Sequence, residues 1–251
     1  MPDEFYVGYL PLPEGLKRFL FVLVPVLIVV VLGLSFTITS QQSDPGPGTW
    51  DLSQTVTYTG TYQATPYPML TVADDTTDEP RQILLISMGK LGGKDLGLPV
   101  DGGAFSVAGY PIERGEGTLL LTVETPSTDI QAQNPVESKV ETQALGAQTL
   151  AGQIIDPKCY FGAMKPGEGK VHKACATLCI KGGIPPMFMT TNPAGERSYD
   201  LLLDEDGSGI TGEHLEALLP YIADPVQIAG QVGRVGSMLV FKIDPTRIDR
   251  F

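Results

Sequence analysis

Basic residues are scarce in this sequence. Its 251 residues include 17 lysines and arginines against 29 aspartates and glutamates, which gives a net charge of −12. The acidic excess is not confined to the N-terminal end, because residues 1–18 hold two basic and three acidic residues and so contribute only −1. A surface of that sign repels phosphate backbones, and it therefore argues against a nucleic-acid partner.

Charge of either sign is absent between Phe19 and Thr39. As a helix, this run would be about 30 Å long, which matches the hydrocarbon core of a membrane. Lys17 and Arg18 directly precede the run, and no Lys or Arg follows it before Arg81. The positive-inside rule then places the N-terminus in the cytoplasm. We expect a single-pass protein of the bacterial inner membrane, with residues 1–18 as a cytoplasmic stub, a transmembrane helix at 19–39 and periplasmic C-terminal domains.

A small-x-small cleavage site is also missing after this run, where the sequence reads SFTITSQQ. The alternative interpretation is a cleaved signal peptide, and the run is long for the apolar part of one. We therefore favour an uncleaved anchor.

Catalytic motifs are absent as well. The chain has no G-x-S-x-G elbow and only two histidines, His172 and His214. The stretch 204–209 resembles the start of a calcium-binding loop, but Leu215 stands where that loop requires a glutamate. The stretch 89–94 resembles a phosphate-binding loop, but Asp95 replaces the required serine or threonine. We interpret both stretches as glycine-rich turns and expect that the protein is not an enzyme.

Turn-forming residues and strand patterns are plentiful. The 29 glycines and 21 prolines favour turn-rich β structure. Apolar alternation predicts a first group of strands in TVTYTGTYQ, RQILLISMG and FSVAGYPIERGEGTLLLTVE, and a second group in TLAGQIID, YDLLLD and VQIAGQVGRVGSMLVFKID. Between the groups, the polar, glutamine-rich residues 129–148 read as a linker, with one helical stretch around Val136 to Leu145.

The two groups of strands repeat each other. FSVAGYPIERGEGTLLLTVE and VQIAGQVGRVGSMLVFKID share an apolar–Ala–Gly opening, an arginine, a glycine-bearing turn and an apolar strand. Such repetition predicts tandem small barrels. Their size and strand number fit the five-stranded Greek-key barrel of the oligonucleotide/oligosaccharide-binding (OB) type, and two structurally unrelated β domains are the alternative. We therefore predict a mainly β protein in which a linker at 40–49 leads from the helix to a first OB-like barrel at 50–128 and a second at 149–251.

All three cysteines and one histidine crowd into one segment of the second barrel, at Cys159, His172, Cys175 and Cys179. The spacing within KVHKACATLCI predicts a short helix from Lys170 to Ile180, followed by a glycine stop signal. On such a helix the histidine and its two neighbouring cysteines share one face. We expect Cys159, at the end of the strand GQIIDPKC, to approach that face.

Two interpretations of this segment remain open. A Cys3His set suits Zn²⁺ or a copper ion in tetrahedral or trigonal geometry, although the spacing matches no standard zinc finger. Alternatively, Cys159 forms a disulfide with Cys175 or Cys179, as cysteines outside the cytoplasm usually do. A disulfide would leave one cysteine unpaired, which is unusual for an exported protein, so the odd number of cysteines supports the metal interpretation.

Residues 152–243 resemble a poorly characterised group of bacterial extracytoplasmic domains. The resemblance rests on Asp156-Pro-Lys-Cys159-Tyr160, on the pattern His-x-x-Cys-Ala-x-x-Cys from His172 to Cys179, and on Gly183-Ile-Pro185. It implies a small β-barrel and a functional role for the Cys/His set. The resemblance implies no particular reaction.

These features lead to three functional expectations. The first is an accessory or structural subunit of a respiratory or photosynthetic electron-transfer complex, with integral membrane subunits as partners and a basic soluble carrier, such as a cytochrome c, docking on the acidic surface. The second is a metal-binding or electron-transfer protein with zinc or copper as its cofactor. The third is a solute-binding or oligosaccharide-binding module, because OB-type barrels bind extended ligands on one face.

Overall fold

The computed structural model describes residues 12–40, 48–73, 80–97, 103–114, 119–123, 131–133 and 142–251. The chain divides into two compact units, Met1–Asp44 and Pro45–Phe251. Most of the expected cytoplasmic stub lies outside the described residues, as do residues 41–47 of the expected linker.

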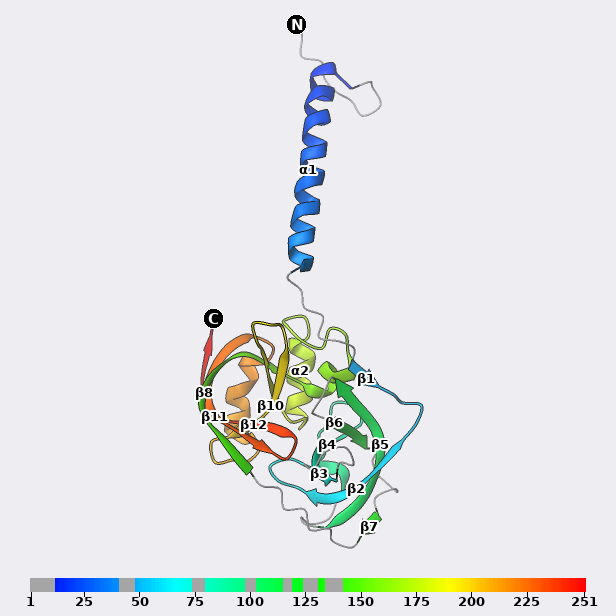
Figure 1. Ribbon diagram of the computed structural model, residues 1–251, viewed down its shortest axis with the longest axis vertical. Helices are drawn as coiled ribbons and strands as arrows, with labels where there is room; N and C mark the ends of the chain where they lie inside the picture. Colours follow the sequence, from blue (N-terminus) through cyan, green and yellow to red (C-terminus); the bar gives the residue numbers. More distant parts are fainter. Residues whose placement is uncertain are drawn as a thin grey trace. The chain divides into compact units, whose positions relative to one another are not determined.

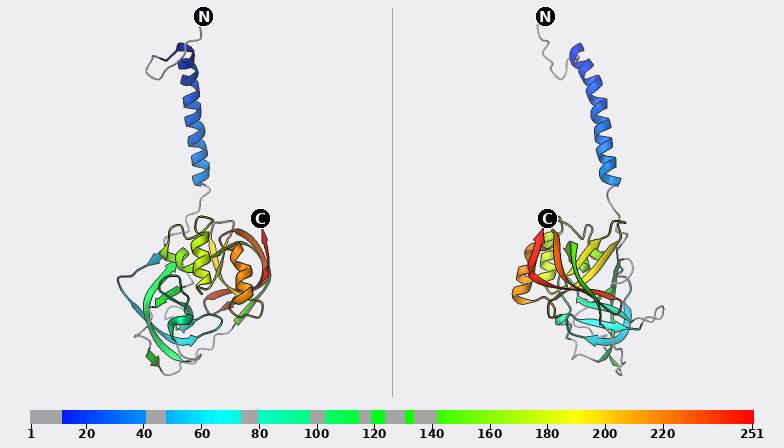
Figure 2. Two further views of the ribbon diagram at one scale, coloured as in Figure 1. Left: turned by 180° about the vertical axis from the view of Figure 1, so that it is seen from behind. Right: turned by 60° about the vertical axis from the view of Figure 1, so that its left-hand side comes forward.

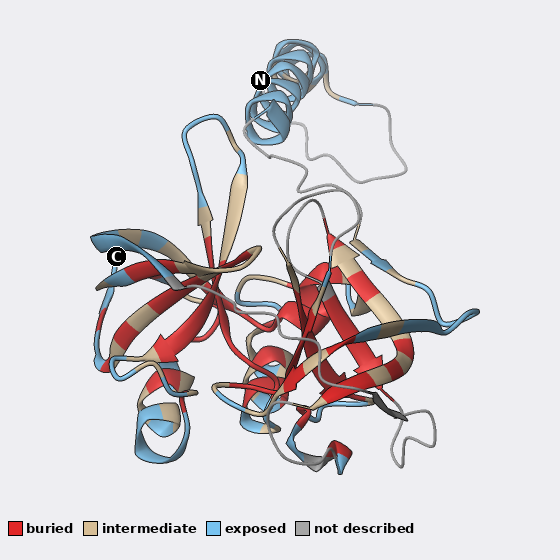
Figure 3. Cartoon of the chain, turned by 60° about the horizontal axis from the view of Figure 1, so that its bottom comes forward, coloured by how far each residue is buried: buried red, intermediate tan, exposed pale blue. Residues whose placement is uncertain are grey.

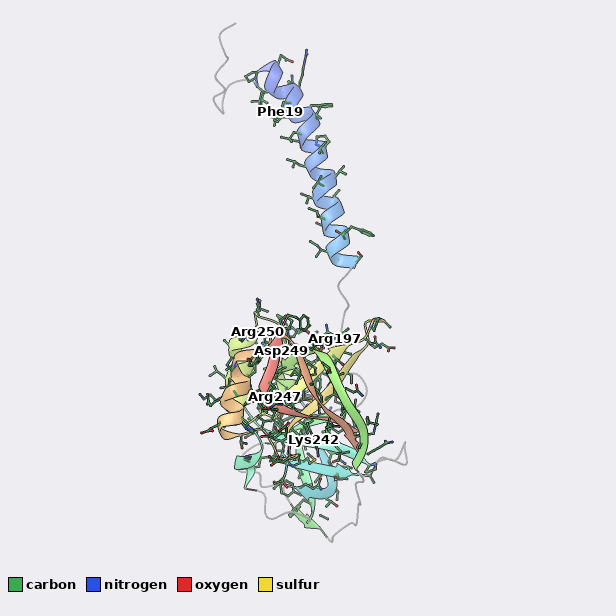
Figure 4. The ribbon with its side chains drawn as sticks, turned by 90° about the vertical axis from the view of Figure 1, so that its left-hand side faces the viewer. Phe19, Arg197, Lys242, Arg247, Asp249 and Arg250 are labelled. Carbon is green, nitrogen blue, oxygen red and sulfur yellow. The ribbon has the colours of Figure 1, made fainter. Side chains whose placement is uncertain are left out.

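The first unit contains one helix, α1 (Glu14–Ser40), which includes Pro25. It is long and apolar enough to cross a membrane. None of its residues is buried (Figure 3). Its side chains point outward on all sides (Figure 4, where Phe19 is labelled). The helix thus extends the expected span at 19–39 by one turn toward the N-terminus.

The second unit contains two closed five-stranded barrels (Figure 1). The first barrel is closed by β2 (Val56–Gln63), β3 (Met69–Val72), β4 (Arg81–Ser87), β6 (Leu119–Val123) and β5 (Ala104–Arg114). Two short strands, β1 (Gly48–Trp50) and β7 (Gln131–Gln133), pair with β5, and the 3-10 turn η1 (Lys94–Leu96) follows β4.

The second barrel repeats this order with β8 (Thr142–Ile155), β9 (Met187–Thr191), β10 (Arg197–Asp204), β12 (Met238–Arg250) and β11 (Pro225–Val235). Its helical segments are the π-helical turn η2 (Cys159–Ala163), α2 (Lys173–Lys181), α3 (Gly212–Leu218) and η3 (Leu219–Tyr221).

Both barrels have the strand order of an OB-type barrel. In each, the third and fifth strands run parallel and every other closing pair is antiparallel. The repeated sequences form the equivalent strands, β5–β6 in the first barrel and β11–β12 in the second. The predicted mainly β fold with an N-terminal helix and two small barrels is therefore confirmed.

The two motif-like stretches also occupy equivalent positions. Each is a turn that follows the third strand of its barrel and folds back on it through one bridge, Ile86 to Gly92 in the first barrel and Leu203 to Gly209 in the second. Their interpretation as glycine-rich turns is confirmed.

Both expected linkers differ from the structure, and β1 begins at Gly48, inside the linker expected at 40–49. Strand β8 begins at Thr142, inside the expected linker 129–148, and β7 lies within that linker too. The helical stretch expected around Val136 to Leu145 is strand from Thr142 onward, because this part pairs with β11, and residues 134–141 lie outside the described residues.

The barrels pack against each other through a shared apolar core to which the second, third and fifth strands of each contribute. On β4, Ile83 and Leu85 point into the first barrel, whereas Leu84 and Ile86 point into a shared apolar core. The second barrel contributes Met187, Met189, Leu201 and Leu203 from β9 and β10 to the same core. This explains why these strands are continuous apolar runs: both of their faces are buried (Figure 3).

This packing bears on the oligosaccharide-binding expectation. OB-type barrels bind extended ligands on the face of their second and third strands. Here those faces of both barrels are buried against each other. The arrangement argues against ligand binding at this face, and it leaves the loops as the candidate functional regions.

A buried hydroxyl links the barrels. Tyr67 of the first barrel donates a hydrogen bond to Leu202 O (3.0 Å) and accepts one from the N–H of Ile210 (2.9 Å). We expect Tyr67→Phe to lower the free energy of unfolding by about 2–3 kcal/mol, because two buried backbone groups lose their partner. Chemical denaturation measures this, with Tyr110→Phe on β5, where the ring is partly exposed, as the control. Equal stability of the two variants would contradict the inter-barrel role of Tyr67.

Candidate metal centre

The candidate site lies in the connection between the first two strands of the second barrel, residues 156–186. This connection carries η2 and α2, and Figures 1 and 2 show α2 between the two barrels. The equivalent connection of the first barrel is only residues 64–68. The site is therefore an elaboration of one barrel, placed where it meets the other.

Asp156 begins the connection. It is fully buried directly after β8, and its Oδ1 accepts hydrogen bonds from the N–H groups of Lys158 (3.0 Å) and Cys159 (3.4 Å). These bonds turn the chain out of the strand, so Cys159 lies in the π-helical turn η2. The expectation that Cys159 ends a strand is wrong, because β8 stops at Ile155.

The predicted helix is present as α2 and begins three residues later than expected. Residues 170–172 form a turn closed by the bond from His172 N to Gly169 O (2.9 Å), and His172 is the N-cap residue. Lys173 fixes the start of α2 by an ion pair of 2.7 Å with Asp224. The helix therefore presents its ligand-type side chains from a fixed position.

The structure brings the four predicted site residues together in two overlapping sets. The donor atoms of Cys159, His172 and Cys175 lie within 4.8 Å of one another, and so do those of Asp156, Cys159 and Cys179. Cys159 belongs to both sets. Cys179 does not belong to the first set. In the second set it lies with Cys159 and Asp156, a residue that the predicted ligand set did not include.

Two buried polar atoms in these sets have no hydrogen-bond partner among the described residues. They are His172 Nε2 and Asp156 Oδ2, and each set contains one of these two residues. The side chains of His172 and Asp156 are 3% and 0% exposed. Leaving such a group unsatisfied costs about 1–3 kcal/mol, and more for a charged group. A metal ion bound by one of these residues would satisfy its unpaired atom.

The three cysteines are free thiols in an apolar surrounding. Cys159 and Cys179 are buried with Ile184, and Cys175 packs at the edge of this cluster, partly exposed. A hydrogen bond from Cys159 lowers the pKa of Cys179, and the same bond raises the pKa of Cys159. Burial lowers the pKa of His172 and so favours the neutral imidazole, which is the form that binds metals.

Each barrel contributes a lysine to the other around this cluster. Lys90, in the turn after β4, donates hydrogen bonds to Sγ of Cys175 (2.7 Å) and Sγ of Cys179 (3.5 Å), and the first of these raises its pKa. Buried Lys158 donates to the carbonyl oxygens of Ser87 (2.8 Å) and Gly89 (2.7 Å). The cationic groups offset part of the negative charge of the Asp156 carboxylate, and they would offset that of a thiolate formed by metal binding.

Sequence reasoning missed Asp156 as a donor and Lys90 as a neighbour of the cysteines. The sequence could have indicated Asp156, since it lies only three residues before Cys159. The sequence could not have indicated Lys90, because it is far from the cysteines along the chain and approaches them only through the packing of the barrels. His214 is exposed and pairs with Asp204, and the structure places it outside both sets.

Comparison with known proteins identifies no relative. No protein-family model, no curated protein and no solved structure matches the chain. The resemblance of residues 152–243 to bacterial extracytoplasmic domains stays a prediction.

Proposed function

We propose that this protein is a membrane-anchored metal-binding protein that holds Zn²⁺ or a copper ion at Cys159, His172 and Cys175. One observation carries the proposal: a buried imidazole with an unpartnered nitrogen lies within 4.8 Å of two thiols. Neutral imidazole and thiolate are the donors that zinc and copper prefer in proteins.

The geometry of this set is compatible with either metal. Thiolate-to-zinc and imidazole-to-zinc distances of about 2.3 Å and 2.0 Å can be reached by small side-chain adjustments from donor atoms within 4.8 Å of one another. Three protein donors make a trigonal site for Cu⁺, or a tetrahedral site for Zn²⁺ with one position left for another ligand.

Local charge favours metal binding over electron exchange with a basic carrier. Residues 158–181 contain five lysines and one glutamate, although the chain as a whole is acidic. A basic carrier such as a cytochrome c would be repelled by this segment, whereas an acidic partner would be attracted. We therefore regard metal handling or structural stabilisation as the role of the site.

The proposed setting is the bacterial inner membrane, with α1 as the anchor, the N-terminus in the cytoplasm and the barrels in the periplasm. The role as an accessory subunit of an electron-transfer complex remains a proposal for the whole protein. It is supported by the outward-facing apolar side chains of α1, which can contact lipid or a partner helix. Co-purification of integral membrane subunits in mild detergent tests it.

Cobalt titration tests the metal proposal directly. The full-length protein, reduced and freed of metal in mild detergent, should develop the absorption of thiolate-bound Co²⁺, and Zn²⁺ should displace the cobalt. Cys159→Ser, which removes the thiol common to both sets, should abolish this absorption. Absence of the absorption in the unsubstituted protein would contradict the proposed function.

A further inference from the structure

We propose that the site is binuclear: a second metal ion is held by Asp156, Cys159 and Cys179, and the Cys159 thiolate bridges the two ions. This inference rests on the proposed function, because it adds a position to the same centre. It commits the site to divalent ions of the zinc class, since a carboxylate is a poor donor to soft Cu⁺.

The ligand sets support two positions over one. Cys175 and Cys179 belong to different sets, and Lys90 Nζ lies 2.7 Å and 3.5 Å from their sulfur atoms. A single ion would leave one set with an unsatisfied buried group. With two ions, His172 Nε2 is satisfied in the first set and Asp156 Oδ2 in the second.

The orientation of Asp156 supports the second position independently. Two backbone N–H groups hold Oδ1, so the carboxylate cannot rotate without breaking the turn after β8. This fixes the side chain with Oδ2 buried and without a partner among the described residues. Among the described residues, the neighbouring ligand-type atoms are the sulfurs of Cys159 and Cys179, and a carboxylate oxygen at about 2.0–2.2 Å is a common zinc ligand.

The number of charges also fits. Three thiolates and the Asp156 carboxylate carry four negative charges, which equal the positive charges of two divalent ions. Lys90 is exposed and can then turn away from Cys175 toward solvent, whereas Lys158 remains bonded to Ser87 O and Gly89 O. Protein sites with two metal ions commonly separate them by about 3.5–4 Å, a spacing that one bridging sulfur can span.

The test is the stoichiometry of Zn²⁺ and Co²⁺ binding to the reduced full-length protein, measured by titration and by elemental analysis after gel filtration. We expect two equivalents for the unsubstituted protein and one for Asp156→Asn, in which the amide oxygen can still accept the two N–H bonds of the turn. Asp200→Asn, at a second buried aspartate outside the site, should retain two equivalents.

A bridging thiolate also has a spectroscopic consequence that can be measured on the unsubstituted protein, without any variant. With two equivalents of Co²⁺ bound, magnetic coupling through Cys159 should reduce the electron paramagnetic resonance signal per cobalt relative to one equivalent. One equivalent in the unsubstituted protein, two in Asp156→Asn, or uncoupled cobalt ions would overturn the binuclear inference and leave the proposed function standing. Binding of no metal at all would overturn both.

Discussion

His172→Gln should lower the affinity for Zn²⁺ at the first position by about 100-fold or more. The substitution removes one of three protein donors, and loss of residues that only support metal ligands already costs about 10–100-fold. Glutamine is close to histidine in size, and the buried position next to α2 can therefore remain filled. Competition with a chromophoric zinc chelator measures the change.

The chain offers a matched control for this prediction. His214, the only other histidine, lies near the start of α3, is exposed and is bonded to Asp204 of β10. His214→Gln should therefore leave the zinc affinity unchanged. Equal affinities of the two variants would show that His172 is not a ligand, and a loss in both would point to a general effect on folding.

Gly92→Ala should destabilise the paired barrels by about 3 kcal/mol or more, because overpacking of a close backbone contact forces the backbone apart. A Cβ atom at this position would lie 1.9 Å from Gly183 O, and Gly92 N donates to Gly182 O at 2.9 Å. This contact joins the turn that carries Lys90 to the end of α2. We therefore expect weaker zinc binding in the same variant.

Denaturant unfolding of the full-length protein in detergent measures the stability loss. Gly33→Ala in α1 is the control, since nothing lies within 4 Å of the added Cβ. An unchanged unfolding midpoint for Gly92→Ala would mean that the two barrels do not approach each other as closely as the structure shows.

Much of the fold follows from local sequence patterns. The repeated strands alternate or form short apolar runs, and each pattern specifies a strand with one or two buried faces. The uncharged run at 19–39 specifies a helix by its length and composition. Strand β8 was harder to delimit, because residues 143–149 are exposed and show no regular apolar alternation, and the pairing with β11 decides the extent of the strand.

The site was only partly predictable from the sequence, because part of its geometry depends on tertiary packing. The spacing of His172, Cys175 and Cys179 follows from helix geometry, and their proximity to Cys159 requires only a short connection. Their division into two sets, by contrast, depends on the turn at Asp156, where the strand stops before Cys159. The position of Lys90 depends on the packing of two barrels, which no local pattern contains.

The disulfide interpretation makes a different prediction from the metal interpretation. Cys159 and Cys179 are neighbours, and their oxidation would leave Cys175 as the single free thiol. It would also leave His172 Nε2 without a partner among the described residues, since a disulfide offers only weak acceptors. The unsatisfied imidazole is the reason to favour a metal.

The most direct test of the metal centre is elemental analysis of the protein purified in detergent without chelators, combined with a count of reactive thiols. The proposed function predicts at least one equivalent of zinc or copper per chain, and the binuclear inference predicts two of zinc, with the thiols protected until a chelator removes the metal. A metal-free protein with one reactive thiol before reduction and three after it would contradict the account and identify the segment as a disulfide clamp.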